Sequence, residues 1–442
     1  MSAFVHPDEI RSRFSAALSA MYRAEVLQYG ALLTLVADIN AQAIKADASG
    51  SDRLAASDEL ARLSEERHGA IRVGTADELA TIAHAFAVMG MEPVSYYNLA
   101  PAGVPVHSTA FRPVDPAALA RNPFRVFTSL LRLELIEDEA LREEAASTLA
   151  RRDIFTPGAR ELIQTAASAG GLDENEADRF VSELLETFRW HAQATVSAET
   201  YERLVAAHRL IADVVSFKGP HINHLTPRTL DIDAAQAAMP EHGITPKETI
   251  EGPPARACPI LLRQTSFKAL EEAIAFPDAE GTTAGTHTAR FGEIEQRGCA
   301  LTPAGRALYD AALASKDFSA LPDDWDALRR GELAWFRYRA TPQGLAARAE
   351  TADLEDLIAL GHVVAEPITY EDFLPVSAAG IFQSNLGSEA RAAAYAVDPA
   401  KAEFEQALGR PVQDEMALYR AEQDASIDAT LKALGLEQVA EI

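Results

Sequence analysis

The chain has 442 residues, of which 66 are acidic and 40 are basic, so its formal net charge at pH 7 is -26. This charge repels phosphate backbones and anionic lipid surfaces, and it argues against a nucleic-acid partner or a membrane partner. The composition, with 48% hydrophobic and 24% charged residues, is that of an ordinary globular protein. The length alone favours two or three structural units.

The cysteine content and the apolar stretches indicate an intracellular protein. The two cysteines, Cys258 and Cys299, are too few for a disulfide framework and have no Cys-x-x-Cys spacing. We therefore expect two buried thiols and a reducing, cytoplasmic environment. Residues 1–14 carry several charges where a secretory signal would be apolar. The longest apolar stretch, residues 30–36, is far shorter than the roughly 20 residues that cross a bilayer.

The first part of the chain predicts helices followed by a module of strands and one helix. In residues 1–60 the apolar side chains recur at helical spacing, which predicts N-terminal helices. Residues 61–121 predict a first βαβ-type module: a short strand that begins at His68, a helix from Thr75 to Met89, and then two runs rich in strand-forming residues. Thr75 is expected to be the N-cap of the helix, because acidic residues follow it in the first turn.

The middle of the chain repeats this order after a helical stretch. Residues 122–210 have helical periodicity and predict a helical insertion. Residues 211–300 predict a second module of the βαβββ type, with an extended run at 221–228, a helix at 231–239 and a last strand within 286–297.

The remaining residues, 301–442, predict a helical C-terminal region. Within it, residues 373–386 are small or apolar, contain glycine and carry no charge, so we expect them to form a buried segment that lines a pocket. We interpret residues 1–442 as a single large catalytic unit built from these segments.

A short pattern occurs once in each mixed unit. His68-x-x-x-Arg72 and His224-x-x-x-Arg228 each precede a predicted helix that ends at a glycine. We interpret this as a weak internal repeat of one module. In an extended strand, residues four apart lie on one face, so each histidine is expected to share a face with its arginine. His221 lies three residues before His224, and the repeat favours His224 as the functional residue of that pair.

The predicted strand 293–297 carries two glutamates on one face. Glu293 and Glu295 are two residues apart, and burying both is costly unless they are paired or bound to a cation. Two neutral imidazoles and one carboxylate can hold a divalent metal on one side and leave positions open opposite. His68 and His224 are the candidate imidazoles. The alternation of the strand does not show which glutamate is the ligand. The alternative to a metal site is a surface strand whose Glu293 is paired to Arg290 or Arg297.

These residues resemble two related groups of dioxygenases. The strand Glu-Ile-Glu-Gln-Arg at 293–297 resembles the Glu-Ile-Ile-Gln-Arg strand of 4-hydroxyphenylpyruvate dioxygenase. Residues 67–72, 217–228 and 376–382 resemble the 2-oxoadipate dioxygenase/decarboxylase family, which belongs to the vicinal oxygen chelate superfamily. The likeness extends from about residue 10 to about residue 420.

The resemblance implies a fold, a cofactor and a reaction. The fold is α+β, with paired vicinal-oxygen-chelate βαβββ modules that form a curled mixed sheet around the metal and are surrounded by helices. The metal is Fe(II), and the reaction is the oxidative decarboxylation of 2-oxoadipate with O2 to 2-hydroxyglutarate and CO2, a step of lysine catabolism.

The resemblance also implies the site residues. His68, His224 and Glu293 are the metal ligands, and the likeness to hydroxyphenylpyruvate dioxygenase selects Glu293 over Glu295. Arg72 binds a substrate carboxylate and joins the three ligands in the catalytic set. The remaining substrate-binding residues implied in this way are Val376 and Ser377, which line the pocket.

Two other functions fit the same residues. One is a metal-dependent lyase or isomerase of the vicinal oxygen chelate type, with Glu295 as general base, because this fold supports several reactions. The other is a protein without catalytic activity that binds a small acid through hydrogen-bonded histidines. The ligand set also suits Mn, Co and Zn, and the choice among 2-oxo acids and the oligomeric state stay open.

Overall fold

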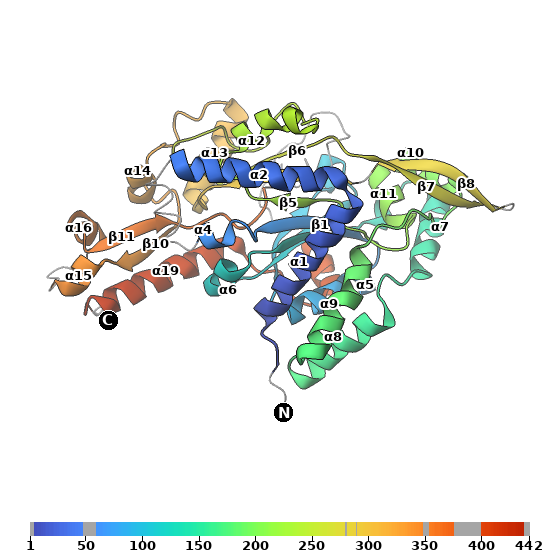
Figure 1. The fold of residues 1–442 in the computed structure, drawn as a ribbon, viewed down its shortest axis with the longest axis horizontal. Coiled ribbons are helices and arrows are strands. Elements are labelled where there is room, and N and C mark those ends of the chain that lie inside the picture. The colour runs from blue at the N-terminus through green and yellow to red at the C-terminus, as the bar shows by residue number, and fades with distance from the viewer. Residues whose placement is uncertain are drawn as a thin grey trace.

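The computed structural model describes residues 4–46, 59–278, 281–288, 290–347, 353–374 and 399–436. The described chain is α+β, which confirms the predicted class. In Figure 1 the strands of a central sheet run through the middle of the molecule, with helices packed around them. The expected pocket-lining residues Val376 and Ser377 lie outside the described residues.

The central sheet has five strands in the order β2-β3-β4-β1-β5. Strand β1 is parallel to β4 and antiparallel to β5, and the other pairs are antiparallel. The strands are β1 Arg67–Val73, β2 Glu92–Asn98, β3 Val106–Arg112, β4 Arg125–Leu131 and β5 Leu225–Pro227.

The other described strands form three two-stranded sheets, and these pairings do not make the single curled sheet that was expected. The pairs are β6 Leu262–Ser266 with β9 Glu293–Arg297, β7 Glu271–Asp278 with β8 Gly281–Thr288, and β10 Phe336–Ala340 with β11 Val363–Pro367. One parallel bridge, from Arg228 to Glu295, places β9 beside the end of β5. The last strand, expected within 286–297, is divided between the end of β8 and β9. Of the extended run expected at 221–228, only the three residues of β5 are in a strand.

Helices lie on both faces of the central sheet, whereas the hairpin of β7 and β8 forms one end of the molecule (Figure 1). Among the described helices, none is both long enough and apolar enough to cross a membrane. The α-helices are α1 Pro7–Glu25, α2 Leu27–Ala46, α4 Glu59–Arg62, α5 Ala76–Val88, α6 Pro116–Arg121, α7 Glu139–Ala150, α8 Pro157–Ala169, α9 Glu174–Phe188, α10 Ala198–Ala207, α11 Arg209–Val215, α12 Ile232–Ala238, α13 Pro303–Ser315, α14 Trp325–Arg330, α15 Pro342–Ala346, α16 Leu354–Ala359, α18 Pro399–Leu408 and α19 Glu415–Ala433. The 3-10 helices are η1 Ala100–Ala102, η2 Leu133–Leu135 and η3 Met239–His242.

Several local predictions are confirmed, and three strands were missed. Thr75 caps α5, because its hydroxyl accepts the backbone N–H of Glu78. The expectation of helices throughout 122–210 is wrong at its start, where β4 lies at the centre of the sheet. Every residue of β4 is buried, so it lacks the alternation that distinguishes a strand from a helix in sequence. Likewise, β10 and β11 lie within the C-terminal region that was expected to be helical.

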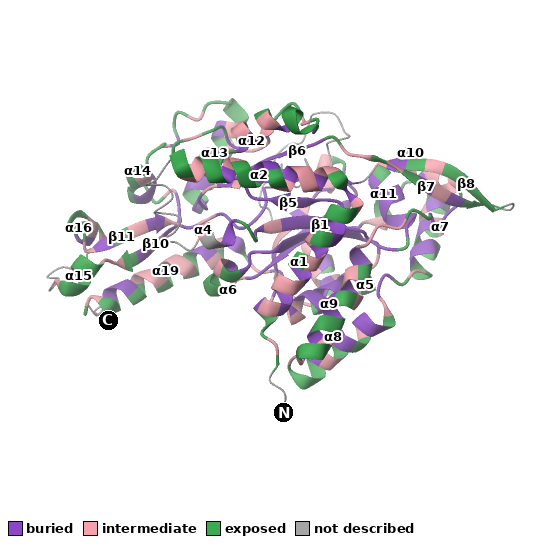
Figure 2. Cartoon of the chain, viewed as in Figure 1, coloured by how far each residue is buried: buried purple, intermediate pink, exposed green. Residues whose placement is uncertain are grey.

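The alternation of β1 divides its side chains between two hydrophobic cores. Ile71 and Val73 pack into a core with α1, α5, α8 and α9, whereas Ala70 packs into the core on the other face. His68 and Arg72 have the parity of Ala70, so they lie on that second face. Figure 2 shows that β1 and β5 are buried along their length, while the outer sides of α2 and α8 are exposed.

Candidate metal centre

Three side chains from three neighbouring segments meet inside the protein. His68 lies on β1, His224 immediately precedes β5, and Glu293 begins β9. All three are buried, and each offers one ligand atom such that these atoms lie within 4.8 Å of one another. The described residues therefore contain a cluster that could hold a metal ion, made of the three residues singled out from the sequence.

The pairing of the strands explains why these residues meet. In the antiparallel pair of β1 and β5, His68 is opposite Thr226, so His224, two residues before Thr226, shares its face. Beyond β5, the backbone N–H of Thr229 donates to the carbonyl of Glu295 at 2.7 Å, which holds β9 alongside. Residues 68, 224 and 293 are thus brought to one face by the order β1, β5, β9.

The distances in the cluster fit a metal site. The Nε2 atom of His68 lies 3.1 Å from Oε2 of Glu293, and the Nε2 atom of His224 lies 3.7 Å from the same oxygen. Metal-ligand bonds of about 2.1 Å at right angles place neighbouring ligand atoms about 3 Å apart. Both ring nitrogens of His224 are buried and have no hydrogen-bond partner among the described residues. An unsatisfied buried imidazole is costly, and a bound cation would satisfy it.

The environment shifts the pKa values of the two imidazoles in opposite directions. Burial lowers the pKa of His224 well below its ordinary value, and the charges of His68 and Arg72 add to this effect. Burial also acts to lower the pKa of His68, but the carboxylates of Glu295 and Glu293 outweigh it and raise that pKa. His224 is therefore neutral, which is the form of histidine that binds metals.

The two glutamates of β9 lie on opposite sides of the His68 ring. Glu293 faces Nε2, whereas Oε2 of Glu295 lies 3.0 Å from Nδ1. The Glu293 carboxylate also accepts hydrogen bonds from Thr226 at 3.1 Å and from Gln264 at 3.0 Å. A carboxylate at the second nitrogen of a metal-binding histidine commonly orients the ring. The sequence analysis did not identify Thr226 or Gln264, and no motif marked them.

Comparison with known proteins identifies the family of the chain. A family model described as 2-oxoadipate dioxygenase/decarboxylase matches residues 14–385. The chain belongs to this family. The 2-oxoadipate dioxygenase/decarboxylase of Escherichia coli K12 is 58% identical over 96% of this chain and 98% of its own length. The protein of that description from Pseudomonas putida KT2440 is 57% identical over 98% of each chain.

A solved structure extends the likeness to the fold. The crystal structure of the hydroxyglutarate synthase in complex with 2-oxoadipate from Pseudomonas putida is 54% identical, with a TM-score of 0.90 over 99% of this chain and all of that one. The family resemblance predicted from the sequence is confirmed, and with it the prediction that the chain is an enzyme of this family.

Glu295 also belongs to a buried network of ion pairs. Arg297 lies 2.8 Å and Arg125 lies 3.8 Å from the Glu295 carboxylate. Burial alone would raise the pKa of Glu295, but the charges of Arg297, His68 and Arg125 lower it to about 2. Glu295 is therefore ionised at neutral pH. The alternative of a surface strand is wrong, because both Glu293 and Glu295 are buried.

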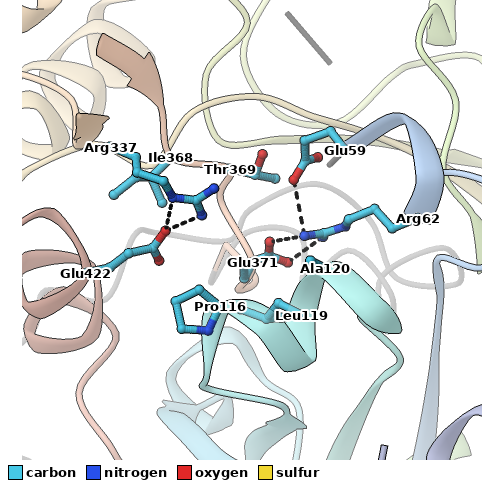
Figure 3. A pocket seen from close by; sticks show the side chains of 10 residues that line it. All are labelled: Glu59, Arg62, Pro116, Leu119, Ala120, Arg337, Ile368, Thr369, Glu371 and Glu422. Atoms are coloured by element: carbon cyan, nitrogen blue, oxygen red, sulfur yellow. Dashed lines mark hydrogen bonds and ion pairs between the residues drawn. The ribbon is translucent and has the colours of Figure 1, made fainter. Parts of the chain in front are cut away.

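The same network extends from Arg125 to a small polar pocket. Arg125 pairs with Glu371, and Glu371 pairs with Arg62 at 2.9 Å. Figure 3 shows Arg62 between two carboxylates at this pocket, and it shows a second ion pair there, between Arg337 and Glu422. The candidate ligands His68, His224 and Glu293 are not among the residues that line it. These are Glu59, Arg62, Pro116, Leu119, Ala120, Arg337, Ile368, Thr369, Glu371 and Glu422.

Arg72 and Arg228 have different partners although they occupy equivalent places in the repeat. Arg72 donates to Asp213 at 2.6 Å, whereas Arg228 pairs with Glu59 and Glu66. His221 faces Asp213, at 3.4 Å, and not the cluster that contains His224. Asp213 lies more than 140 residues from Arg72 in the sequence, so no local pattern revealed this contact.

Gly69 allows β1 and β5 to approach at the cluster. A Cβ atom at Gly69 would lie 2.8 Å from the carbonyl oxygen of His224 and 2.6 Å from Ile222. We expect Gly69→Ala to separate the two strands and to weaken Fe(II) binding on the order of 10-fold, because it displaces His224 from His68. Fe(II) titration of the purified variant measures this.

Gly30→Ala provides the control for that experiment. Its Cβ would meet the side chain of Arg23 at 3.3 Å, within a helix far from the cluster in sequence, and that flexible side chain can move. Iron affinity is expected to equal that of the wild type. Wild-type affinity in Gly69→Ala would contradict the importance of this close approach.

Proposed function

We propose that the chain is an Fe(II)-dependent dioxygenase that converts 2-oxoadipate and O2 to 2-hydroxyglutarate and CO2. The observation that carries the proposal is the buried group His68, His224 and Glu293, in which the His224 imidazole has no hydrogen-bond partner in the part of the chain that the structure describes. The names of the relatives support the substrate, because they describe 2-oxoadipate dioxygenase/decarboxylases and a hydroxyglutarate synthase in complex with 2-oxoadipate.

In this proposal His68, His224 and Glu293 hold the iron, and Glu295 orients His68 through its Nδ1 atom. Two imidazoles and one carboxylate on one side of an iron ion leave positions for a 2-oxo acid and for dioxygen. When bound, the iron supplies the redox chemistry of the reaction. Thr226 and Gln264 fix the Glu293 carboxylate by donating hydrogen bonds to it.

Arg72 is proposed to bind the carboxylate of the substrate that is remote from the metal. It shares the face of His68 and lies four strand residues away, which corresponds to about 13 Å along β1. This separation accommodates a six-carbon diacid between the metal and a guanidinium group. An arginine suits this role because its planar fork matches a carboxylate. Val376 and Ser377 are proposed to line the same pocket.

We also propose that the chain contains two vicinal-oxygen-chelate modules and acts as one catalytic unit over residues 1–442. The first unit has the order β1, α5, β2, β3, β4, which is a βαβββ order. The second unit begins with β5 and α12 and ends with β9. The proposed ligands come from both units, so neither would be active alone.

Oxygen consumption tests the proposed function. The protein is loaded with Fe(II) without oxygen, and O2 uptake and CO2 release are then measured with 2-oxoglutarate, 2-oxoadipate and 2-oxopimelate. We expect one O2 consumed and one CO2 released for each 2-hydroxyglutarate formed from 2-oxoadipate. Conversion without O2 uptake would indicate the lyase or isomerase. Glu295 is a poor general base for that alternative, because Arg297, His68 and Arg125 outweigh burial and lower its pKa to about 2.

A further inference from the structure

Groups from three other segments converge on the buried carboxylate of Asp213 in α11. Arg72 of β1 donates from Nη1 to Oδ2 at 2.6 Å. The other oxygen, Oδ1, accepts from Nε2 of His287 of β8 at 2.9 Å and lies 3.4 Å from Nε2 of His221. Both carboxylate oxygens are thus engaged by groups that are far apart in the sequence.

The partners of Asp213 are themselves held in place. The hydroxyl of Tyr201 lies 2.8 Å from Nδ1 of His287, so it donates to that atom when Nε2 donates to Asp213. The ring of Trp190 is stacked parallel to the His287 imidazole, with centroids 6.0 Å apart, and Phe217 lies 4.7 Å from it. These rings hold the His287 imidazole against Asp213, and the burial of Asp213 and Arg72 strengthens their attraction by excluding water.

A fixed carboxylate has a specific effect on an arginine. A free arginine side chain has many rotamers, and ordering it when substrate binds weakens affinity. A guanidinium has five N–H groups in one plane, so it can pair with two carboxylates at different edges. Asp213 can therefore hold Arg72 in position, on the face of β1 that carries His68, before substrate binds.

We propose that Asp213 is a positioning residue that fixes Arg72 for the distal carboxylate of a 2-oxo diacid, and that it thereby sets the preference for diacids over monoacids. The inference rests on the proposed function of the chain as an oxygenase of 2-oxo acids. Asp213 does not touch the reacting atoms in this role. Its effect is confined to substrates with a second carboxylate.

The test compares 2-oxoadipate with 2-oxohexanoate, which has the same chain length and lacks the distal carboxylate. In Asp213→Asn we expect the KM for 2-oxoadipate to rise 10- to 100-fold, whereas kcat/KM for 2-oxohexanoate changes less than 3-fold. Iron content per chain should equal that of the wild type. Asp213→Glu, which keeps the charge, should recover part of the diacid preference.

Asp233→Asn is the matched control, because Asp233 also pairs with an arginine, Arg263, at 2.6 Å, but away from the Arg72 cluster. Its ratio of diacid to monoacid activity should not change. If Asp213→Asn does not fold, His287→Gln takes its place in the test. We expect it to lower the ratio of diacid to monoacid activity 3- to 10-fold.

The outcomes separate this inference from the proposed function. A wild-type protein that does not consume O2 with 2-oxoadipate overturns the proposed function and this inference together. The inference alone is overturned if the wild type turns over normally and Asp213→Asn leaves the ratio of diacid to monoacid activity unchanged. Where Asp213→Asn does not fold, an unchanged ratio in His287→Gln has the same meaning. Equal losses of activity with 2-oxoadipate and 2-oxohexanoate also overturn the inference, since they indicate that Asp213 has a purely structural role.

Discussion

Replacing His224 by alanine is expected to reduce bound iron to less than about a tenth of an ion per chain. The variant removes one of three protein ligands, and the remaining imidazole and carboxylate can then satisfy each other, because His68 and Glu293 lie 3.1 Å apart. Metal analysis after anaerobic loading and removal of unbound iron measures the effect. His68→Ala and Glu293→Ala are expected to give the same result.

His242→Ala is the control for this prediction. His242 is exposed at the end of η3, and its ring nitrogen contacts the carbonyl of Ala238. The variant should bind as much iron as the wild type. Near-stoichiometric iron in His224→Ala would remove His224 from the proposed ligand set.

The two glutamates of β9 provide a sharper comparison within the same experiment. Glu293→Gln should behave like His224→Ala, because it weakens a direct ligand. Glu295→Gln should still bind iron at saturating concentration, with affinity lowered roughly 10- to 100-fold, which is the usual cost of losing a group that orients a metal ligand. The reverse order of effects would assign the metal to Glu295.

Replacing Arg72 by lysine is expected to lower kcat/KM for 2-oxoadipate on the order of 100-fold or more while iron content stays unchanged. Lysine keeps the positive charge but offers no planar fork, so it cannot bind the distal carboxylate and Asp213 in the geometry of a guanidinium. Steady-state O2 uptake over a range of substrate concentrations, together with metal analysis, measures both quantities.

Arg263→Lys is the control, since Arg263 also pairs with an aspartate at 2.6 Å. It should leave the kinetics with 2-oxoadipate near those of the wild type. An equal loss of iron and of activity in Arg72→Lys would count against a substrate-binding role, because it would indicate general damage to the centre.

Local patterns were sufficient for many elements of the fold. The capping residue Thr75, the helix α5 and the strands β2 and β3 were predicted, because caps and alternation are local properties. The strand β4 was missed for the opposite reason. Its seven residues are all buried, and what makes them a strand is their position between β1 and β3.

The sequence by itself determined the family and the residues brought together at the candidate metal centre, His68, His224 and Glu293. Only the tertiary structure decided which glutamate faces which nitrogen of His68, because alternation puts Glu293 and Glu295 on one face without naming their neighbours. It also decided that Arg72 pairs with Asp213, a residue of another segment. Such long-range pairs depend on the order in which strands pack, and spacing along the chain does not encode that order.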